Sequence, residues 1–371
     1  MLRHTLILSA TTALGAGACD APPATPGAGE ADEAARTLEA MKPPRRARPA
    51  IAVVGQNDGT ETTDFIVPYA VLSASGAADV LAVAPEARAI RLIPALTIEP
   101  QLTLTGFDER YPDGADYVVV PKIEDTAHPA IVAWIRAQAA RGATIVGICS
   151  GVKTVAAAGL LDDRAATGHW YDLDELRRTY PTMRWVPDRR YVADRGVITT
   201  TGVSASLPVS LALVEAIAGR DRAVALAAEL GVAAWDARHE SSAFRLEPAT
   251  KLVAARNKTL APDTWILPVG PGVDDIALAF MADAWSRTFR SRALAVAEQA
   301  GPIRTRHGLI LVPTPITDAE RAAARDLPAP DRAAPARALA TSLDDIARLY
   351  GTATAAFVAL QLEYRWIARA S

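Results

Sequence analysis

The sequence predicts an α/β fold in which a mostly parallel β-sheet is sandwiched between helices. Short, unbroken apolar runs rich in β-branched residues are typical of strands that are buried on both faces. Segments with helical character separate these runs, which favours parallel strands joined by crossover helices. A glycine-flanked cysteine also stands between one strand and the next helix, at the end of the sheet where α/β folds place their sites. The predicted strands are residues 50–55, 80–84, 117–120, 144–148 and 197–202.

Length and composition limit the classes of protein to consider. The chain has 371 residues, of which 50% are hydrophobic and 22% charged, as expected for one or two globular domains. A net charge of −3 argues against a general nucleic-acid binder. The two cysteines suit neither a disulfide framework nor a metal site, and we expect no cofactor and no metal.

The N-terminus has the form of a bacterial lipoprotein signal peptide over residues 1–19. A short positive start is followed by an apolar run and small residues up to Cys19. We expect Cys19 to be acylated, which would hold the protein in the periplasm at the inner-membrane lipid. Ordinary cleavage or an unprocessed tail are the alternatives. Residues 20–48 are rich in Pro, Ala, Glu and Arg and predict a flexible linker.

The first half of the predicted domain opens with the buried strand at residues 50–55 and a polar loop. A helix follows at residues 64–72, with Asp64 in its first turn, where a negative charge complements the helix dipole. Residues 80–84 form the second strand, and residues 90–93 and 96–104 suggest a hairpin-like pair.

The second half of this domain continues the alternation. A strand at residues 117–120 ends at Pro121, and an amphipathic helix leads into the strand before the cysteine. An Ala-rich helix follows the cysteine and ends at Gly159. The remaining helices are expected at residues 128–140, 152–158, 172–180 and 204–217, and the domain closes near Gly219.

The stretch from Gly147 to Gly151 has the pattern G-x-C-x-G of a nucleophile elbow, with cysteine in the nucleophile position. Glycines suit the flanking positions because the turn leaves little room for side chains. The partial positive charge of a helix N-terminus would favour the thiolate of Cys149. The alternative is a structural cysteine beside a tight turn.

Residues 49–219 resemble the ThiJ/PfpI family of the class I glutamine-amidotransferase-like superfamily. The resemblance rests on four motifs in order, at residues 147–151, 157–161, 166–170 and 198–202. The most similar branches are isonitrile-hydratase-like enzymes and the amidase-like domains of AraC-type regulators, here without the DNA-binding domain. The resemblance implies a flavodoxin-like sheet with a reactive cysteine.

The resemblance also implies roles for individual residues. Cys149 matches the reactive cysteine, and Asp64 matches the acidic residue that hydrogen-bonds it. Ser150 takes the place of a small hydroxyl residue beside the cysteine, and His169 that of a histidine near the site. The residues themselves leave other roles open: Asp64 could only complement the helix dipole, Ser150 could cap a helix, and His169 could be a packed side chain.

Backbone N–H groups of Ser150, Lys122 and Gly151 are the expected oxyanion donors. In the family pattern a Gly-Gly pair stands where this chain has Lys122 and Ile123, which makes close approach of a substrate harder. No histidine directly follows Cys149, which argues against the proteolytic branch.

Residues 220–371 contain a partial repeat of the segment pattern of the first half-domain. Segments 265–270, 272–280, 293–297, 303–304 and 309–313 follow the order of its strands and helix, and Asp275 mirrors Asp64. We interpret this as a truncated α/β half-repeat without a second cysteine elbow. The alternative is that the similarity arises by chance. It suggests a homodimer or an internal pseudo-dimer. A single terminal helix is expected over residues 342–364.

Together these features predict a cysteine-dependent hydratase or hydrolase in the cell envelope. Its substrate would be a small electrophilic carbon compound: an isonitrile, an amide or a reactive carbonyl. The alternative is a non-catalytic ligand-binding or redox-sensing module, in which Cys149 is oxidised. Nucleic acid is not an expected partner.

Overall fold

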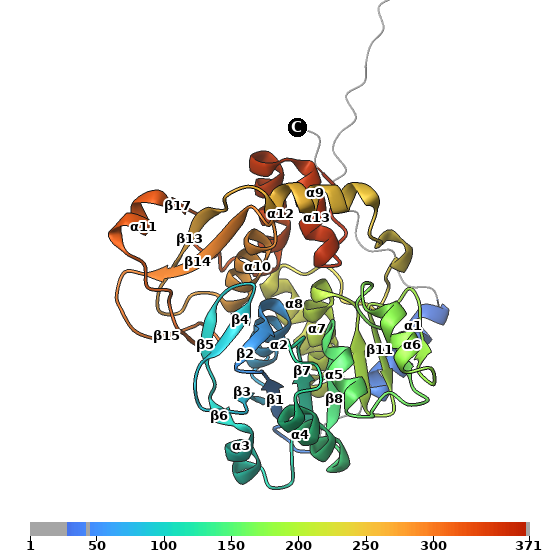
Figure 1. The fold of residues 1–371 in the computed structure, drawn as a ribbon. Helices are drawn as coiled ribbons and strands as arrows, with labels where there is room; N and C mark the ends of the chain where they lie inside the picture. Colours follow the sequence, from blue (N-terminus) through green and yellow to red (C-terminus); the bar gives the residue numbers. More distant parts are fainter. Residues whose placement is uncertain (1–27, 42–44, 369–371) are drawn as a thin grey trace, which may run out of the picture.

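The computed structural model describes residues 28–41 and 45–368, and a seven-stranded sheet forms its centre (Figure 1). The strand order is β11-β12-β8-β7-β1-β3-β6, and every neighbouring pair is parallel except β11 with β12. The predicted α/β fold with a mainly parallel sheet is therefore confirmed. The strands are β1 (Ala50–Val54), β3 (Asp79–Ala84), β6 (Leu102–Thr103), β7 (Tyr117–Val120), β8 (Thr144–Gly147), β11 (Tyr191–Asp194) and β12 (Val197–Thr200).

Helices cover both faces of this sheet because successive residues of each strand point to opposite sides. In β1, Ile51 and Val53 pack into the core under α2 and α7, whereas Ala52 and Val54 face the core under α3, α4 and α5. The bounds are α2 (Thr62–Ala74), α3 (Leu104–Arg110), α4 (Pro129–Ala140), α5 (Gly151–Ala157) and α7 (Ser206–Ala218). Helices α2, α4, α5 and α7 match the predicted ones to within a few residues, whereas α3 was not predicted.

Shorter elements complete the first half of the chain. They are β2 (Asp58–Glu61), β4 (Ile90–Ile93), β5 (Thr97–Glu99), β9 (Ala165–Ala166), α6 (Leu173–Thr179), β10 (Arg184–Trp185), the 3₁₀ turn η1 (Val203–Ala205) and α8 (Arg220–Leu230). The predicted hairpin-like pair is present in part as the antiparallel strands β4 and β5, but its second arm ends at Glu99, and Leu102–Thr103 instead pair with β3 in the central sheet.

The C-terminal half contains the strands and the helix that the partial repeat over residues 265–313 predicts. A parallel pair of strands flanks helix α10, and a short antiparallel pair follows. These elements are β13 (Asp263–Val269), α10 (Asp275–Ser286), β14 (Ser291–Ala297), β15 (Ile303–Arg304) and β16 (Ile310–Leu311). The other elements are η2 (Ser241–Ala243), α9 (Pro248–Lys258), α11 (Asp318–Ala323), β17 (Arg325–Asp326), η3 (Pro335–Arg337), α12 (Ala338–Tyr350) and α13 (Thr352–Gln361).

The two halves of the chain join through one sheet and one helix pair. The sheet has the order β15-β16-β5-β4-β2, with β16 antiparallel to β5, so that the short strands of both halves form one surface. Helix α10 packs against α2, and both belong to the same hydrophobic core (Figure 1). Residue Asp275 begins α10 and is buried, as Asp64 is in α2.

Two sequence predictions are wrong at the level of elements. The segment 20–48 is not a flexible linker throughout, because α1 (Ala28–Ala40) is helical and packs against α7 and β11. The terminal helix is also not continuous: Gly351, at φ 89°, separates α12 from α13, and Ser342 lies inside α12 rather than capping a helix.

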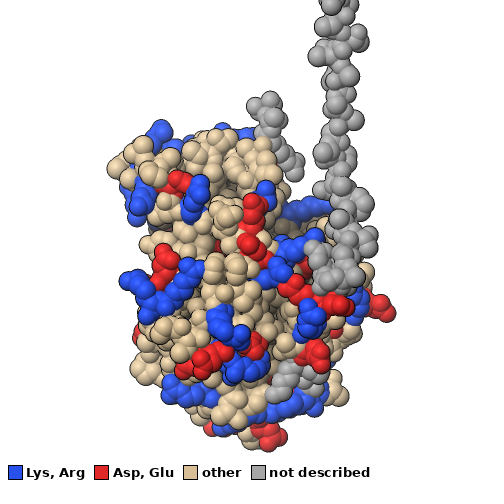
Figure 2. All heavy atoms as spheres, turned by 90° about the vertical axis from the view of Figure 1, so that its right-hand side faces the viewer, with Lys and Arg blue, Asp and Glu red and all other residues tan. Residues whose placement is uncertain are grey.

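On the face drawn in Figure 2, basic and acidic side chains are interspersed rather than gathered by sign. Across residues 28–41 and 45–368, no helix is both long and apolar enough to cross a membrane. The predicted acylation site, Cys19, lies outside the described residues.

Candidate active site

Cys149 occupies a strained turn between β8 and α5. Its φ of 54° lies in the left-handed region that non-glycine residues rarely adopt. The turn is tight: a Cβ on Gly151 would lie 2.1 Å from the carbonyl oxygen of Val120, and one on Gly147 would lie 3.0 Å from the Val155 side chain. Gly151 is therefore required by close packing against backbone atoms, and Gly147 stands where a side chain would have only tight space.

The thiol of Cys149 lies in a buried environment, with 5% of the residue exposed. Its backbone N–H donates to Thr200 Oγ1 at 3.0 Å, and its Sγ lies 3.9 Å from Ser150 Oγ. Burial, followed by the charges of Asp64, Glu61 and Asp172, raises the pKa of Cys149 well above its usual value. The expected stabilisation of a thiolate by the helix N-terminus is outweighed, because desolvation and three carboxylates act against it.

Asp64 lies fully buried in the first turn of α2. Its carboxylate accepts the Lys122 N–H at 3.3 Å and the Ser206 hydroxyl at 3.4 Å, and within the described residues it forms no hydrogen bond to Cys149 Sγ. Burial raises the pKa of Asp64 to about 7, although the Lys122 N–H acts in the opposite direction. Asp64 is therefore able to hold or release a proton near neutral pH.

Ser150 and His169 are linked through a residue that the sequence analysis missed. The Ser150 hydroxyl donates to the carboxylate of Asp172, and His169 Nδ1 lies 4.0 Å from the same carboxylate oxygen. The other ring nitrogen of His169 lies 3.3 Å from the carbonyl oxygen of Gln361. Burial lowers the pKa of His169 despite the nearby Glu363 and Asp172 carboxylates, which favours a neutral ring.

Cys149, Ser150 and His169 line a cavity of about 200 Å³, whereas Asp64 and Asp172 are not among its lining residues. The cavity is large enough for a small organic molecule; most of the exposed area of its wall is apolar, and a few polar side chains reach into it. The lining residues are Glu61, Ile93, Pro94, Lys122, Cys149, Ser150, His169, Val203, Arg287 and Gln361. Across the described parts of the chain, no group of three or more His, Cys, Asp or Glu side chains could hold a metal ion.

Arg287 and Gln361 reach this cavity from the C-terminal half. Arg287 follows α10 directly and donates from Nη2 to Glu61 at 2.6 Å and from Nε to Asp283 at 2.5 Å. Asp283 also accepts the Thr63 hydroxyl at 2.8 Å. Sequence reasoning did not find Arg287, although its place at the end of the repeated helix was a usable signal.

A protein-family model decides how this domain is classified. The model of the DJ-1/PfpI family matches residues 50–216, which include the elbow, Asp64 and the whole seven-stranded sheet. This stretch is a DJ-1/PfpI domain.

Individual known proteins are also similar to parts of the chain. A curated protein, the HTH-type transcriptional regulator CdhR of Pseudomonas aeruginosa, is 44% identical over 55 residues, or 15% of this chain and 16% of its own length. The match thus spans only a small part of that regulator.

Solved structures similar to the DJ-1/PfpI domain include Drosophila melanogaster DJ-1beta, with 22% identity and a TM-score of 0.45, over 50% of this chain and 98% of its own. A THiJ/PfpI family protein from Pseudomonas syringae has 25% identity and a TM-score of 0.44, over 56% and 81% of the two chains. An AraC family transcriptional regulator from Pseudomonas putida has 17% identity and a TM-score of 0.43, over 48% and 97%.

The hydrogen bonds of the structure show that one of the expected oxyanion donors, Gly151, is wrong. The N–H of Gly151 donates to the carbonyl oxygen of Ile148 at 2.7 Å and is not available to a substrate. The N–H of Lys122 faces the Asp64 carboxylate, whereas that of Ser150 is directed towards the Cys149 sulfur. Ser150 therefore remains the candidate donor at the cavity wall, because the Lys122 N–H already donates to Asp64.

Proposed function

We propose that this protein is a cysteine-dependent hydratase or hydrolase that acts on a small electrophilic carbon compound. The observation that carries the proposal is Cys149, held at φ 54° against a small cavity of about 200 Å³. Backbone strain at a cysteine is typical of a nucleophile elbow, and the cavity limits the substrate to a small molecule.

An isonitrile illustrates the chemistry that these residues would perform. The thiol adds to the terminal carbon, which forms a carbon–sulfur bond, and the thiol proton moves to that carbon with Asp64 as the relay. The oxygen of water then bonds to the same carbon, one proton of the water goes to the nitrogen, and the other goes to Asp64. The carbon–sulfur bond breaks, and sulfur takes that proton from Asp64. The product is an N-substituted formamide. A pKa of about 7 at Asp64 supports this proton transfer in both directions.

Amides and reactive carbonyls would use the same nucleophile with a developing oxyanion. Ser150 and Arg287 line the cavity, and the Ser150 N–H and the Arg287 guanidinium would stabilise such an oxygen. Arg287 is buried against Glu61 and Asp283, which fixes its position. A fixed donor stabilises a transition state more than a mobile one, because less reorganisation is needed.

A turnover screen tests this proposal. Purified protein is incubated with alkyl isonitriles, small amides and methylglyoxal, and product is measured by NMR. We expect turnover with at least one of these compounds, loss of turnover in Cys149→Ala, and a decrease of about 100-fold or more in Asp64→Asn. Turnover by Cys149→Ala at the wild-type rate would contradict the proposal.

A redox-sensing or ligand-binding module is the second candidate, and one observation favours it. Burial and neighbouring carboxylates raise the pKa of Cys149, which lowers the thiolate fraction available for catalysis. Oxidation also proceeds through the thiolate, so this observation favours the ligand-binding form; in the redox-sensing form Cys149 would be oxidised to the sulfenic or sulfinic acid. Mass spectrometry after treatment with hydrogen peroxide would find oxygen added at Cys149, in a protein that turns over none of the screened compounds.

We further propose that the C-terminal half-repeat stands where a second subunit would otherwise pack, as an internal pseudo-dimer. The packing of α10 on α2 and the pairing of β16 with β5 support this. Light scattering tests it: the full chain would be monomeric, and a chain that ends at Gly231 would dimerise through the uncovered α2. A dimeric full chain with its interface away from the C-terminal half would contradict this arrangement.

The envelope location is also a proposal, which rests on the sequence around Cys19. Acylation there would hold the folded part near the inner membrane. Metabolic labelling with a palmitate analogue is expected to mark the wild-type chain and not Cys19→Ser. A labelled Cys19→Ser chain, or an unlabelled wild type in the same cells, would contradict it.

A further inference from the structure

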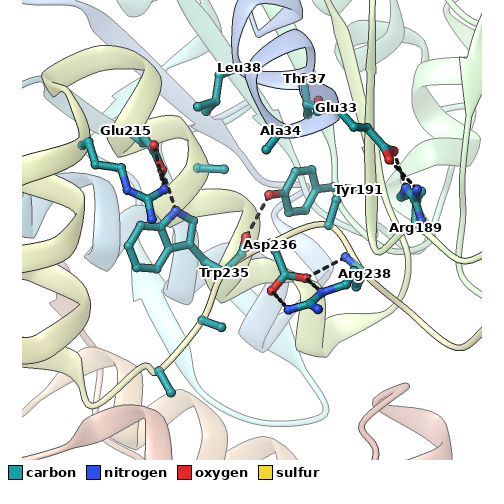
Figure 3. Close-up of a pocket in the computed structure, with 15 residues that line it drawn as sticks. Glu33, Ala34, Thr37, Leu38, Arg189, Tyr191, Glu215, Trp235, Asp236 and Arg238 are labelled. Atoms are coloured by element: carbon teal, nitrogen blue, oxygen red, sulfur yellow. Dashed lines mark hydrogen bonds and ion pairs between the residues drawn. The ribbon is translucent and has the colours of Figure 1, made fainter. Parts of the chain in front are cut away.

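A second pocket lies between α1 and the loop after α8 (Figure 3). Its volume is about 280 Å³, and it shares no lining residue with the cavity at Cys149. We call it the α1 pocket. Ala34, Thr37 and Leu38 of α1 form one wall, and Trp235 and Ala237 belong to the opposite one.

The charged side chains around the α1 pocket are neutralised by one another. Arg189 donates to both carboxylate oxygens of Glu33, at 2.5 and 2.6 Å. Arg238 donates to both oxygens of Asp236, each at 2.9 Å (Figure 3). A charged ligand would have to compete with these bidentate pairs.

The remaining carboxylate of the pocket is also satisfied. Glu215 accepts Trp235 Nε1 at 2.8 Å and Arg220 at 3.0 Å. The guanidinium of Arg220 lies 5.0 Å from the Trp235 ring centre, and the Tyr191 hydroxyl donates to the Trp235 carbonyl oxygen at 2.8 Å. The polar atoms that shape the pocket are thus occupied within the protein.

The surface of the α1 pocket that remains available to a ligand is mainly apolar. Its lining includes five alanines, at positions 34, 212, 233, 234 and 237, together with Leu38, Tyr191 and Trp235. Flat aromatic rings and small methyl groups favour a planar apolar partner. The volume lies just below the range of about 300–1,000 Å³ that is usual for drug-sized ligands, which favours a compact molecule.

We propose that the α1 pocket binds a neutral, compact aromatic molecule, with α1 as one wall of the site. This binding is independent of the chemistry at Cys149. An anionic analogue of the same shape is expected to bind poorly, because the basic groups at the pocket already have carboxylate partners and burying an unpaired charge is costly.

Two naphthalene probes test this proposal on the full chain. The neutral probe is 1-naphthylamine, and the charged probe is 5-aminonaphthalene-1-sulfonate; binding is followed by the change in probe fluorescence. We expect saturable binding of the neutral probe and binding of the sulfonate that is weaker by about tenfold or more. No saturation with the neutral probe, or equal binding of both probes, overturns the proposal.

Adjacent positions of α1 provide a matched pair of variants. Ala34→Trp fills the pocket from α1 and should weaken binding of 1-naphthylamine by about tenfold or more, whereas Ala35→Trp, which does not line the pocket, should leave it unchanged. Ala237→Trp fills the pocket from the other wall and should act like Ala34→Trp. Circular dichroism confirms that all three variants fold. Equal binding by Ala34→Trp, Ala237→Trp and Ala35→Trp overturns the proposal.

Discussion

Asp64 and Cys149 are two acids buried at one site, and their charges oppose each other. Burial raises the pKa of Asp64 to about 7, and the charge of Asp64 is among the causes that raise the pKa of Cys149. A proton on one group therefore makes it easier for the other to ionise. Such coupling suits Asp64 to the proposed transfer of the thiol proton, because Cys149 ionises more easily once Asp64 is protonated.

The first prediction concerns the thiol pKa in Asp64→Asn. Above pH 7 the wild-type Asp64 is mostly charged, whereas asparagine is neutral at every pH. The variant should therefore show an apparent pKa of Cys149 that is lower by about one unit or more. The rate of alkylation by iodoacetamide against pH measures it, in a Cys19→Ser background where Cys149 is the only cysteine.

The control for this experiment is Asp113→Asn, which removes an exposed carboxylate from the loop before β7. It should leave the alkylation profile unchanged. A Cys149 pKa that is equal in Asp64→Asn and wild type would show that the two groups are not coupled.

A second prediction concerns stability against pH. The folded state holds the Asp64 proton up to a pKa of about 7, whereas in the unfolded chain an aspartate has a pKa of about 3.9. Between these values the folded state binds more protons, so the free energy of unfolding falls as pH rises from about 4 to 7 and is then level. The loss is at most roughly 4 kcal/mol.

Asp64→Asn should remove this loss. Compared with wild type, the variant should gain a few kcal/mol of stability at pH 8 and little at pH 4.5, because a protonated aspartate already resembles asparagine. Urea unfolding at both pH values measures the difference. A gain of the same size at both pH values would point to a cause other than the Asp64 charge.

At the scale of elements, the elbow is where the local sequence determines the structure most strictly. Gly151 lies so close to β7 that a single added carbon would meet the backbone of Val120 and Pro121. Neither neighbour can turn away, since both contacts are with main-chain atoms. The glycine thus fixes how α5 leaves the sheet and, with it, the position of Cys149.

The third prediction follows from this contact. Gly151→Ala should destabilise the protein by about 3 kcal/mol or more, or prevent folding. Gly270→Ala is the matched control, because no atom lies within 4 Å of the added carbon and its φ is not positive. Chemical denaturation compares the two. Similar stability of both variants would mean that β7 and α5 move apart more easily than their packing indicates.

Most of the sheet and its helices could be predicted from sequence because apolar runs such as residues 117–120 are strong local signals. Helix α1 was missed since its apolar residues are few and its packing depends on α7 and β11. The break at Gly351 was missed because a single glycine inside an apolar helical pattern can be tolerated within one helix. Asp172, Glu61 and Gln361 join the site only through tertiary packing, which no local pattern records.

At the scale of the whole molecule, the two halves meet in a buried polar cluster rather than in an apolar contact alone. Arg287, from the C-terminal half, bridges Glu61 and Asp283, and Thr63 donates to Asp283. Glu363, near the end of the chain, accepts the Gly202 N–H at 2.7 Å and bonds His239 at 2.9 Å. The C-terminal half therefore both completes the cavity wall and supplies counter-charges to the first half.

The fourth prediction tests this dependence through Arg287. Arg287→Met keeps much of the side-chain volume but leaves two buried carboxylates without their cation, which should cost about 3–5 kcal/mol. Glu61→Gln removes one of those charges in advance. In the double variant the cost should be smaller than the sum of the single costs by about 1–3 kcal/mol, because Glu61 and Arg287 interact directly.

Arg292→Met, which changes an exposed arginine on β14, is the control and should stay within about 0.5 kcal/mol of wild type. Denaturant unfolding of all four variants measures these costs. Additive costs of Arg287→Met and Glu61→Gln would mean that the contact contributes little to holding the halves together, and that the apolar packing of α2 on α10 carries the association.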